Sequence, residues 1–262
     1  MSRIRLKFRE LKKKDKKAFI AFITAGYPSL DITEKLVLGF DKIGVDIIEL
    51  GVPFSDPMAD GPIIQSSSQY ALESGVNIRD ILGLARRLRR KTGIPICLMT
   101  YYNPVFCFPE KAFVERAVSC GVDGLIIPDL PPEEGSFLIK HSRSSGLDTV
   151  FFVAPTTTFE RVKYICCASK GFIYYVSLTG VTGERKELPK DIASNIKKVK
   201  KLTSTPVCVG FGVSSAEQVR NICRISDGVI VGSAIVSKIK DNIGEPDLVK
   251  HVCNFVRTLL PK

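Results

Sequence analysis

The sequence predicts an α/β protein folded as a single (β/α)8 barrel, the TIM-barrel architecture, with an additional N-terminal helix. Short apolar segments recur along the 262 residues, and each is followed by a segment with the apolar spacing of a helix. No long stretch rich in Ser, Gly or Pro divides the chain, so residues 1–262 are expected to form one domain. A doubly wound open sheet is the alternative architecture.

The expected strands are apolar runs of the kind that form a sheet covered on both faces. They lie at residues 18–24, 46–52, 94–100, 124–129, 149–154, 172–177, 207–211 and 228–231. Eight strands that alternate with helices in roughly 250 residues are the number that a (β/α)8 barrel requires.

The expected helices carry start and stop signals. Favourable starting residues stand at Asp31, at Pro132 with Glu133, and at Ser215. Glycines at positions 44, 93, 121, 146 and 171 are expected to end helices before the chain returns to a strand. Together with the apolar spacing, these signals predict helices at residues 30–43, 77–91, 110–120, 132–145, 159–168, 190–202, 215–223 and 246–259.

The composition narrows the class of protein. The longest apolar runs are far shorter than a membrane span, and the N-terminus lacks the apolar core of a signal peptide. The eight cysteines include no C-x-x-C pair, which favours reduced thiols in a cytoplasmic protein. With only two histidines, the chain offers few ligands for a histidine-rich metal site. We therefore expect a cytoplasmic protein with no membrane segment and no metal.

The net charge of +11 raises the question of nucleic-acid binding. Its cations are concentrated at residues 5–17, 86–91 and 197–201. The last two clusters lie on segments with helical apolar spacing, so we interpret them as solvated helix faces. They contain no interleaved aromatic residues that could stack on bases, and sequence-directed nucleic-acid binding is not expected. A positive field would still attract an anionic substrate.

The stretch at residues 46–65 has the strongest signs of a functional site. Glu49 stands inside an apolar strand, where an unpaired carboxylate costs several kcal/mol, and Asp60 lies on the loop that follows. Enzymes of this architecture carry their chemistry at the C-terminal ends of the strands, so both acids are candidate catalytic groups. The alternative is that Glu49 is a satisfied structural carboxylate and that the loop acids form turns.

Glycine-containing turns follow the last three expected strands. They contain Gly180 and Gly183, then Gly210 and Gly212, and finally Gly232 with Ser233. Glycine lets the backbone approach an anion closely, and amides at a helix N-terminus direct positive charge toward it. A phosphate site often forms after strands seven and eight of this fold, and the three turns predict such a site here.

The motif E-L-G-V-P-F-S-D-P-M-A-D-G-P-I-I-Q at residues 49–65 closely resembles the signature of the tryptophan synthase alpha chain family. The likeness continues in A-F-I-A-F-I-T-A-G-Y-P, M-T-Y-Y-N-P, I-I-P-D-L-P, G-V-T-G-E-R, G-F-G-V-S and G-S-A-I-V, and so spans nearly the whole chain. The resemblance implies a cytoplasmic barrel lyase that cleaves indole-3-glycerol phosphate to indole and glyceraldehyde 3-phosphate in L-tryptophan biosynthesis.

The resemblance also implies a partner. In this family a beta chain joins the indole to serine with pyridoxal phosphate, in an alpha2beta2 heterotetramer. The cofactor is expected in that beta chain and none in this one.

The resemblance assigns roles to particular residues. Glu49 would be the acid and base, Asp60 would accept a hydrogen bond from the indole N–H, and Tyr174 would stand near the catalytic carboxylate. The indole slot would be lined by Phe22, Ile64, Tyr101 and Ile126. The phosphate would be bound by Gly183, Phe211, Gly212, Gly232 and Ser233, and Thr182 would belong to a loop that closes over the substrate. For Tyr174 and the slot residues, packing in the barrel core is the alternative role.

The residues suit this chemistry. A retro-aldol cleavage requires indole C3 to gain a proton and a side-chain hydroxyl to lose one, and one carboxyl group of raised pKa can do both. A Schiff-base aldolase would need a lysine at a strand end, and none of the expected strands has one. A metal-dependent cleavage lacks its ligands.

Two positions depart from the family pattern. Tyr70 stands where relatives commonly have Arg, and Leu178 stands where polar or basic residues are frequent. Both lie near loops that contact the beta chain or gate the pocket in the family. They support an alternative in which the barrel is mainly a binding and activating subunit, with weak cleavage of its own.

Overall fold

The computed structural model describes residues 2–176, 191–210 and 212–261. In these ranges the strands are β1 (Ala18–Thr24), β2 (Ile47–Gly51), β3 (Ile96–Met99), β4 (Gly124–Ile126), β5 (Asp148–Val150), β6 (Phe152–Val153), β7 (Ile173–Val176), β8 (Val207–Gly210) and β9 (Gly228–Val231). The helices are α1 (Arg3–Lys13), α2 (Leu30–Ile43), α3 (Pro62–Glu73), α4 (Ile78–Arg89), α5 (Tyr102–Cys107), α6 (Glu110–Ser119), α7 (Ser136–Ser145), α8 (Phe159–Ala168), α9 (Ile192–Leu202), α10 (Ala216–Ile225), α11 (Ser233–Lys240) and α12 (Leu248–Leu259).

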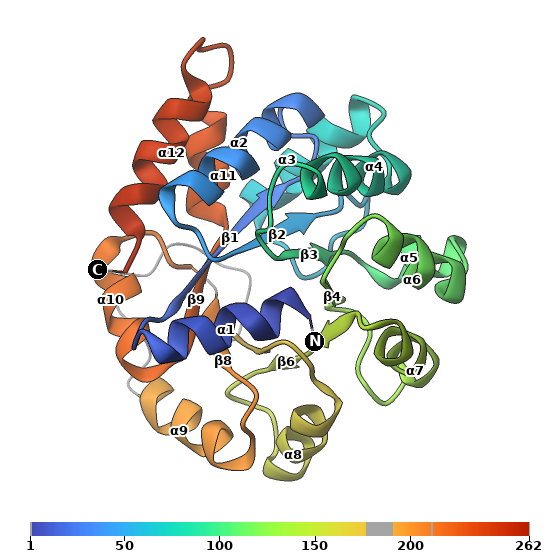
Figure 1. Cartoon of the computed structure of the whole chain (residues 1–262), viewed down its shortest axis with the longest axis vertical. Coiled ribbons are helices and arrows are strands. Elements are labelled where there is room, and N and C mark those ends of the chain that lie inside the picture. The colour runs from blue at the N-terminus through green and yellow to red at the C-terminus, as the bar shows by residue number, and fades with distance from the viewer. Residues whose placement is uncertain (1, 177–190, 211, 262) are drawn as a thin grey trace.

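The strands form one parallel sheet that closes into a barrel, with the helices arranged around it (Figure 1). The strand order is β5-β4-β3-β2-β1-β9-β8-β7-β6, so β5 and β6 are the two ends of the sheet. These two strands are successive pieces of one segment, separated by Phe151, whose carbonyl accepts a hydrogen bond of 3.0 Å from the Tyr174 N–H. The prediction of a (β/α)8 barrel is therefore confirmed, and the open-sheet alternative is wrong.

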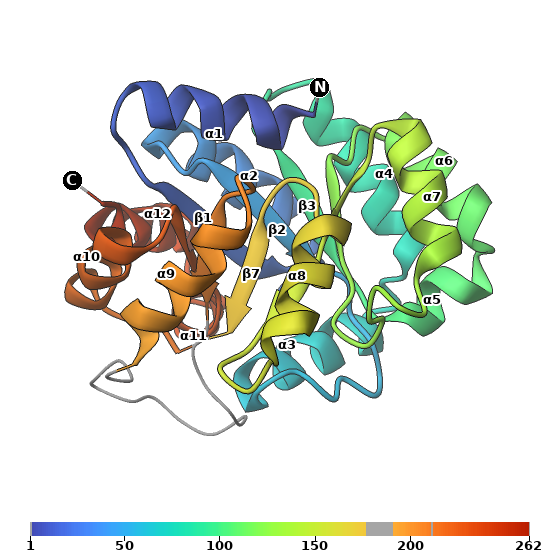
Figure 2. The same ribbon diagram turned by 90° about the horizontal axis from the view of Figure 1, so that it is seen from below.

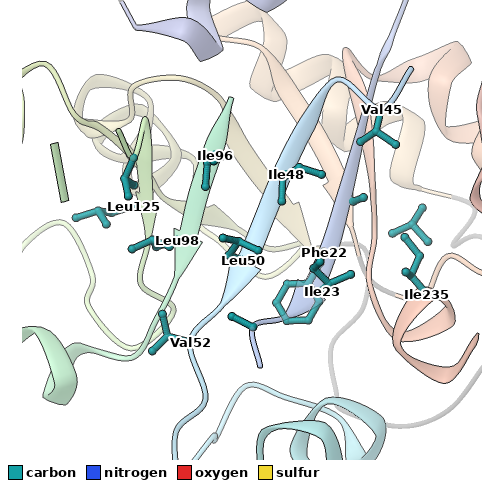
Figure 3. Close-up of a cluster of buried hydrophobic side chains, with 14 of the residues drawn as sticks. Phe22, Ile23, Val45, Ile48, Leu50, Val52, Ile96, Leu98, Leu125 and Ile235 are labelled. Atoms are coloured by element: carbon teal, nitrogen blue, oxygen red, sulfur yellow. The ribbon is translucent and has the colours of Figure 1, made fainter. Parts of the chain in front are cut away.

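Side chains of the strands alternate between the interior of the barrel and the helices outside it. The outer set packs under the helices, and Figure 3 shows Ile48 and Leu50 of β2 beside Ile96 and Leu98 of β3. The inner set forms a separate core, to which β2 contributes Ile47. Because residues two apart on a strand share a face, Glu49 lies on the same inner face as Ile47.

The additional N-terminal helix is also confirmed, and it closes one end of the barrel. Ile4, Phe8 and Leu11 of α1 belong to the inner core, and the ring of Phe8 lies 6.2 Å from that of Phe172, the residue before β7. Figure 2 shows α1 across this end and α3 at the opposite end. Helix α1 thus covers the N-terminal end of the barrel interior.

Some elements differ from the prediction. Helices α3, α5 and α11 were not expected. Helix α3 begins at Pro62, in a stretch whose glycine and proline pattern predicts a loop, and α5 and α11 each begin within three residues of a strand end. Helix α7 begins at Ser136 rather than at residue 132. Gly44 and Gly146 end helices in the left-handed conformation, with φ of 96° and 76°, whereas Gly93 does not have positive φ and does not end α4.

Among the helices of the described ranges, none combines the length and the apolar character needed to cross a bilayer.

Candidate active site

Glu49 lies in the middle of β2, in register with Phe22 of β1 and Cys97 of β3. Its side chain is completely buried, and neither carboxylate oxygen has a hydrogen-bond partner among the described residues. Burial raises the pKa of Glu49 to about 8, and the negative charge of Asp60 adds to the effect. A carboxyl group in this setting holds its proton at neutral pH, so the alternative of a satisfied structural carboxylate does not describe it.

Asp60 lies on the loop between β2 and α3, two residues before the helix begins. Burial raises its pKa to about 6, and a hydrogen bond with the Tyr101 side chain opposes the rise. The Tyr101 hydroxyl also accepts a 2.9 Å hydrogen bond from the N–H of Ala59, and its ring stacks on Phe54 with 5.2 Å between centroids. Tyr101 therefore holds the loop that carries Asp60.

Tyr174 of β7 is 7% exposed and belongs to the inner core, where its ring lies 4.7 Å from that of Phe152. Its pKa is raised well above the ordinary value, first by burial and then by the negative charges of Glu49 and Asp60. The structure therefore brings the two acids and this hydroxyl together inside the barrel. Gly210 of β8 leaves room for the tyrosine, since a Cβ there would lie 2.5 Å from the hydroxyl oxygen.

Phe22 of β1 is the register partner of Glu49 on the neighbouring strand, and its side chain is buried. Two glycines leave space for this ring: a Cβ on Gly51 would lie 2.5 Å from it and one on Gly232 would lie 3.2 Å from it. Ile126 is buried in the inner core, and Ile64 is buried on α3. The importance of Gly51 has no signal in the sequence, because it depends on a ring from another strand.

The glycine turns are described only in part. Thr182, Gly183 and Phe211, together with Gly180 and Leu178, lie outside the described residues. Gly212 is exposed and has φ of +70°, a conformation that favours glycine. Gly232 is the N-cap of α11, and Ser233 is its first residue. Helix α11 thus begins directly after the end of β9, and this helix was not predicted although Ile235, Val236 and Ile239 have helical spacing.

The side chains of the described residues contain no group of three or more His, Cys, Asp or Glu that could hold a metal ion. The mouth therefore offers carboxyl groups, a phenol and backbone amides for chemistry.

These features define a class: a (β/α)8-barrel enzyme whose open mouth carries a buried, protonated carboxyl group beside a second acid. A family model for the tryptophan synthase alpha chain matches residues 8–258. The chain belongs to this family.

Relatives and solved structures agree with this assignment. The chain is 47% identical to the tryptophan synthase alpha chain of Geotalea daltonii over 245 residues, which are 94% of this chain and 93% of the relative. It is also 47% identical to that of Caldanaerobacter subterraneus over 99% of this chain and 98% of the relative. The crystal structure of tryptophan synthase subunit alpha from Legionella pneumophila superposes with a TM-score of 0.92 at 32% identity, covering 99% and 97% of the two chains.

Proposed function

We propose that Glu49 is the acid and base of the reaction that the family catalyses. The family reaction is the cleavage of indole-3-glycerol phosphate to indole and glyceraldehyde 3-phosphate, and membership of the family makes this chain a lyase. The single observation that carries the proposal is a fully buried carboxyl group with no hydrogen-bond partner among the described residues and a pKa of about 8.

The reaction needs a proton at indole C3 and the loss of a proton from the adjacent side-chain hydroxyl. A carboxyl group that is protonated at neutral pH can donate the first proton. Once it is ionised, the same group becomes a strong base in its dry environment and can accept the hydroxyl proton while the carbon–carbon bond breaks. The proton is returned in one turnover, so no cofactor is required in this chain.

Asp60 is proposed to accept a hydrogen bond from the indole N–H. Protonation at C3 places positive charge on the ring, and an ionised carboxylate at the nitrogen stabilises that charge. Its pKa of about 6 leaves Asp60 largely ionised at neutral pH, whereas Glu49 is largely protonated. The two acids therefore suit different roles. The Tyr174 hydroxyl is proposed to hydrogen-bond to Glu49 when that group is ionised.

The phosphate is proposed to bind at the N-terminus of α11 through Gly232 and Ser233, together with Gly212. This proposal is supported by the exposure of Ser233 and by the favourable interaction of an anion with helix N-terminal amides. Gly183 and Phe211 are proposed to complete the site, with Thr182 in the loop that closes over the substrate. Phe22, Ile64, Tyr101 and Ile126 are proposed to line the indole slot.

Membership of an alpha-chain family implies a beta-chain partner. We propose the finer arrangement of an alpha2beta2 heterotetramer in the cytoplasm, with pyridoxal phosphate in the beta chain. A surface for that partner is offered by Met58 and Phe106, which are 77% and 65% exposed on the segments that follow β2 and β3. Two large apolar side chains beside the catalytic loop suit a partner that receives the indole.

The test measures indole release by the isolated chain, and then with the beta chain added. Glu49→Gln is expected to lower the rate by 10²-fold to 10⁴-fold, the usual contribution of an acid–base group, while pull-down of the partner persists. An unchanged rate would overturn the role of Glu49. Loss of both activity and pull-down would point to misfolding, which circular dichroism of the variant would reveal. Loss of cleavage in Glu49→Gln with retained pull-down would also contradict the alternative that the barrel mainly binds and activates the beta chain.

A further inference from the structure

A second hollow lies at the N-terminal end of the barrel, opposite the catalytic mouth. It is a cleft of about 810 Å3 between α1 and the segments around β4, β5 and β7. Its charged lining consists of Arg3, Arg5, Arg143 and Lys170 with Asp123 and Asp148. The proposed reaction uses none of these residues.

The two carboxylates of the cleft are already engaged. Asp123 pairs with Arg3 at 2.8 Å and with Arg89 at 2.9 Å, and Asp148 accepts a hydrogen bond from the Ser2 hydroxyl. Asp148 also interacts electrostatically with both Arg5 and Lys170, so a single negative charge is shared between two positive charges. The cleft therefore retains an excess of positive charge.

The excess cations come from distant parts of the chain. Arg5 lies on α1, Arg143 lies near the end of α7, and Lys170 precedes β7. Arg143 donates to the carbonyls of Cys167 and Ala168 at the end of α8, whereas Arg5 and Lys170 have no ion pair within 4.0 Å in the described ranges. The three cations line the same cleft, and an anion bound there would reduce the repulsion between them.

The positive surface continues beyond the cleft. An adjoining hollow of about 520 Å3 shares Arg3 and Gly121 with the cleft and adds Arg86, Arg89 and Arg90. These arginines belong to the basic run at residues 86–91. Arg89 is not solvated as the sequence predicted, because its guanidinium group donates to the carbonyls of Gly121, Thr92 and Ile94 as well as to Asp123.

We propose that this cleft is a second anion site, which binds a small polyphosphate through Arg5, Arg143 and Lys170. The excess of cations calls for a ligand with several charges rather than one. The volume suits a compound the size of a nucleotide or smaller. Because the cations come from α1 and from the barrel, a bound polyphosphate joins the two and stabilises the closed N-terminal end.

The test is titration of the full chain with tripolyphosphate, followed by calorimetry and by amide NMR. We expect shifts at Gly121 and Gly146, which line the cleft, and an affinity that falls at least tenfold in Arg5→Gln/Lys170→Gln. The matched control is Lys35→Gln/Lys42→Gln, which removes the same charge from the exposed face of α2, outside the cleft. This control is expected to weaken binding less than twofold.

Three results would overturn the proposal. They are the absence of binding, an equal loss of affinity in both double variants, and shifts confined to Gly212 and Gly232 at the catalytic mouth. Thermal unfolding of each variant checks that it folds. The proposal is independent of the lyase assignment, since the activity of Arg5→Gln/Lys170→Gln is expected to match that of the unmodified chain.

Discussion

The two ends of the barrel differ in whether a buried carboxyl group has hydrogen-bond and ion-pair partners. At the N-terminal end Asp123 is 4% exposed, pairs with two arginines and accepts a 2.9 Å hydrogen bond from the Ile96 N–H. Toward the C-terminal mouth, Glu49 is fully buried and neither carboxylate oxygen has a partner in the part of the chain that the structure describes. Both groups are costly to bury, but only the first is compensated.

The difference separates stability from function. A compensated carboxylate contributes to the fold, because its partners lose their own hydrogen bonds when it is removed. An uncompensated carboxyl group contributes nothing of that kind and keeps its proton, which makes it available for chemistry. Substitutions at the end of the barrel that α1 closes are therefore expected to lower stability. Substitutions at the open end are expected to lower activity.

The first expected effect is the loss of stability in Asp123→Asn. The substitution leaves Arg89, which is 15% exposed, without its charged partner, and the free energy of unfolding is expected to fall by about 3 kcal/mol in urea denaturation. Glu49→Gln is expected to leave it unchanged or raise it. Glu133→Gln is the control, because its exposed ion pair with Arg161 contributes less than about 1 kcal/mol. A comparable loss in Glu49→Gln would contradict the distinction between the two ends.

A second expected effect is on activity, in Gly210→Ala. The added Cβ would lie 2.5 Å from the Tyr174 hydroxyl oxygen and must displace the ring from beside Glu49. Misplacement of a group in the mouth is expected to lower kcat/KM by roughly 10²-fold in a steady-state indole assay.

Gly83→Ala is the control for this prediction. Gly83 lies inside α4 with nothing within 4 Å of its Cβ position. This variant is expected to keep full activity and to gain up to about 1 kcal/mol in stability from the higher helix propensity of alanine. Retention of activity in Gly210→Ala would show that Tyr174 has only a packing role.

The third effect is a bell-shaped dependence of kcat/KM on pH. The proposed reaction needs Asp60 ionised and Glu49 protonated, so the limbs are expected near pH 6 and near pH 8. Outside these limbs kcat/KM is expected to change tenfold per pH unit. Asp60→Asn is expected to remove the acid limb from the remaining activity, and persistence of that limb would contradict the role of Asp60.

The candidate acid Glu49 could be predicted from the sequence, but the contacts of Tyr101 and Arg89 could not. Glu49 could be identified because a carboxylate inside an apolar strand is conspicuous along the chain. The role of Tyr101 could not, because its partner Ala59 is 42 residues away and the bond depends on how two loops meet. Arg89 was interpreted as solvated for the same reason: its acceptors include Gly121 and Asp123, which lie beyond the next strand. That residues 1–262 form one domain stays a prediction.

The last expected effect is the change of stability with pH, which reports on the proton of Glu49 alone. The unfolded chain releases this proton near the ordinary pKa of 4.5, whereas the folded chain holds it to about 8. Between these values the folded state binds the extra proton, so its stability falls as pH rises, with a limiting slope of about 1.4 kcal/mol per pH unit.

Glu49→Gln is expected to remove this contribution. The difference in unfolding free energy between the unmodified chain and the variant should therefore change steadily from pH 5 to pH 8 and level off above it, in urea denaturation at each pH. Buried Asp60 acts in the same direction up to about pH 6, but it is present in both proteins and cancels to first order. A difference that does not vary with pH would mean that Glu49 is ionised in the folded chain. The buried carboxyl groups at the two ends of the barrel would then both be ionised, and the contrast between them would be lost.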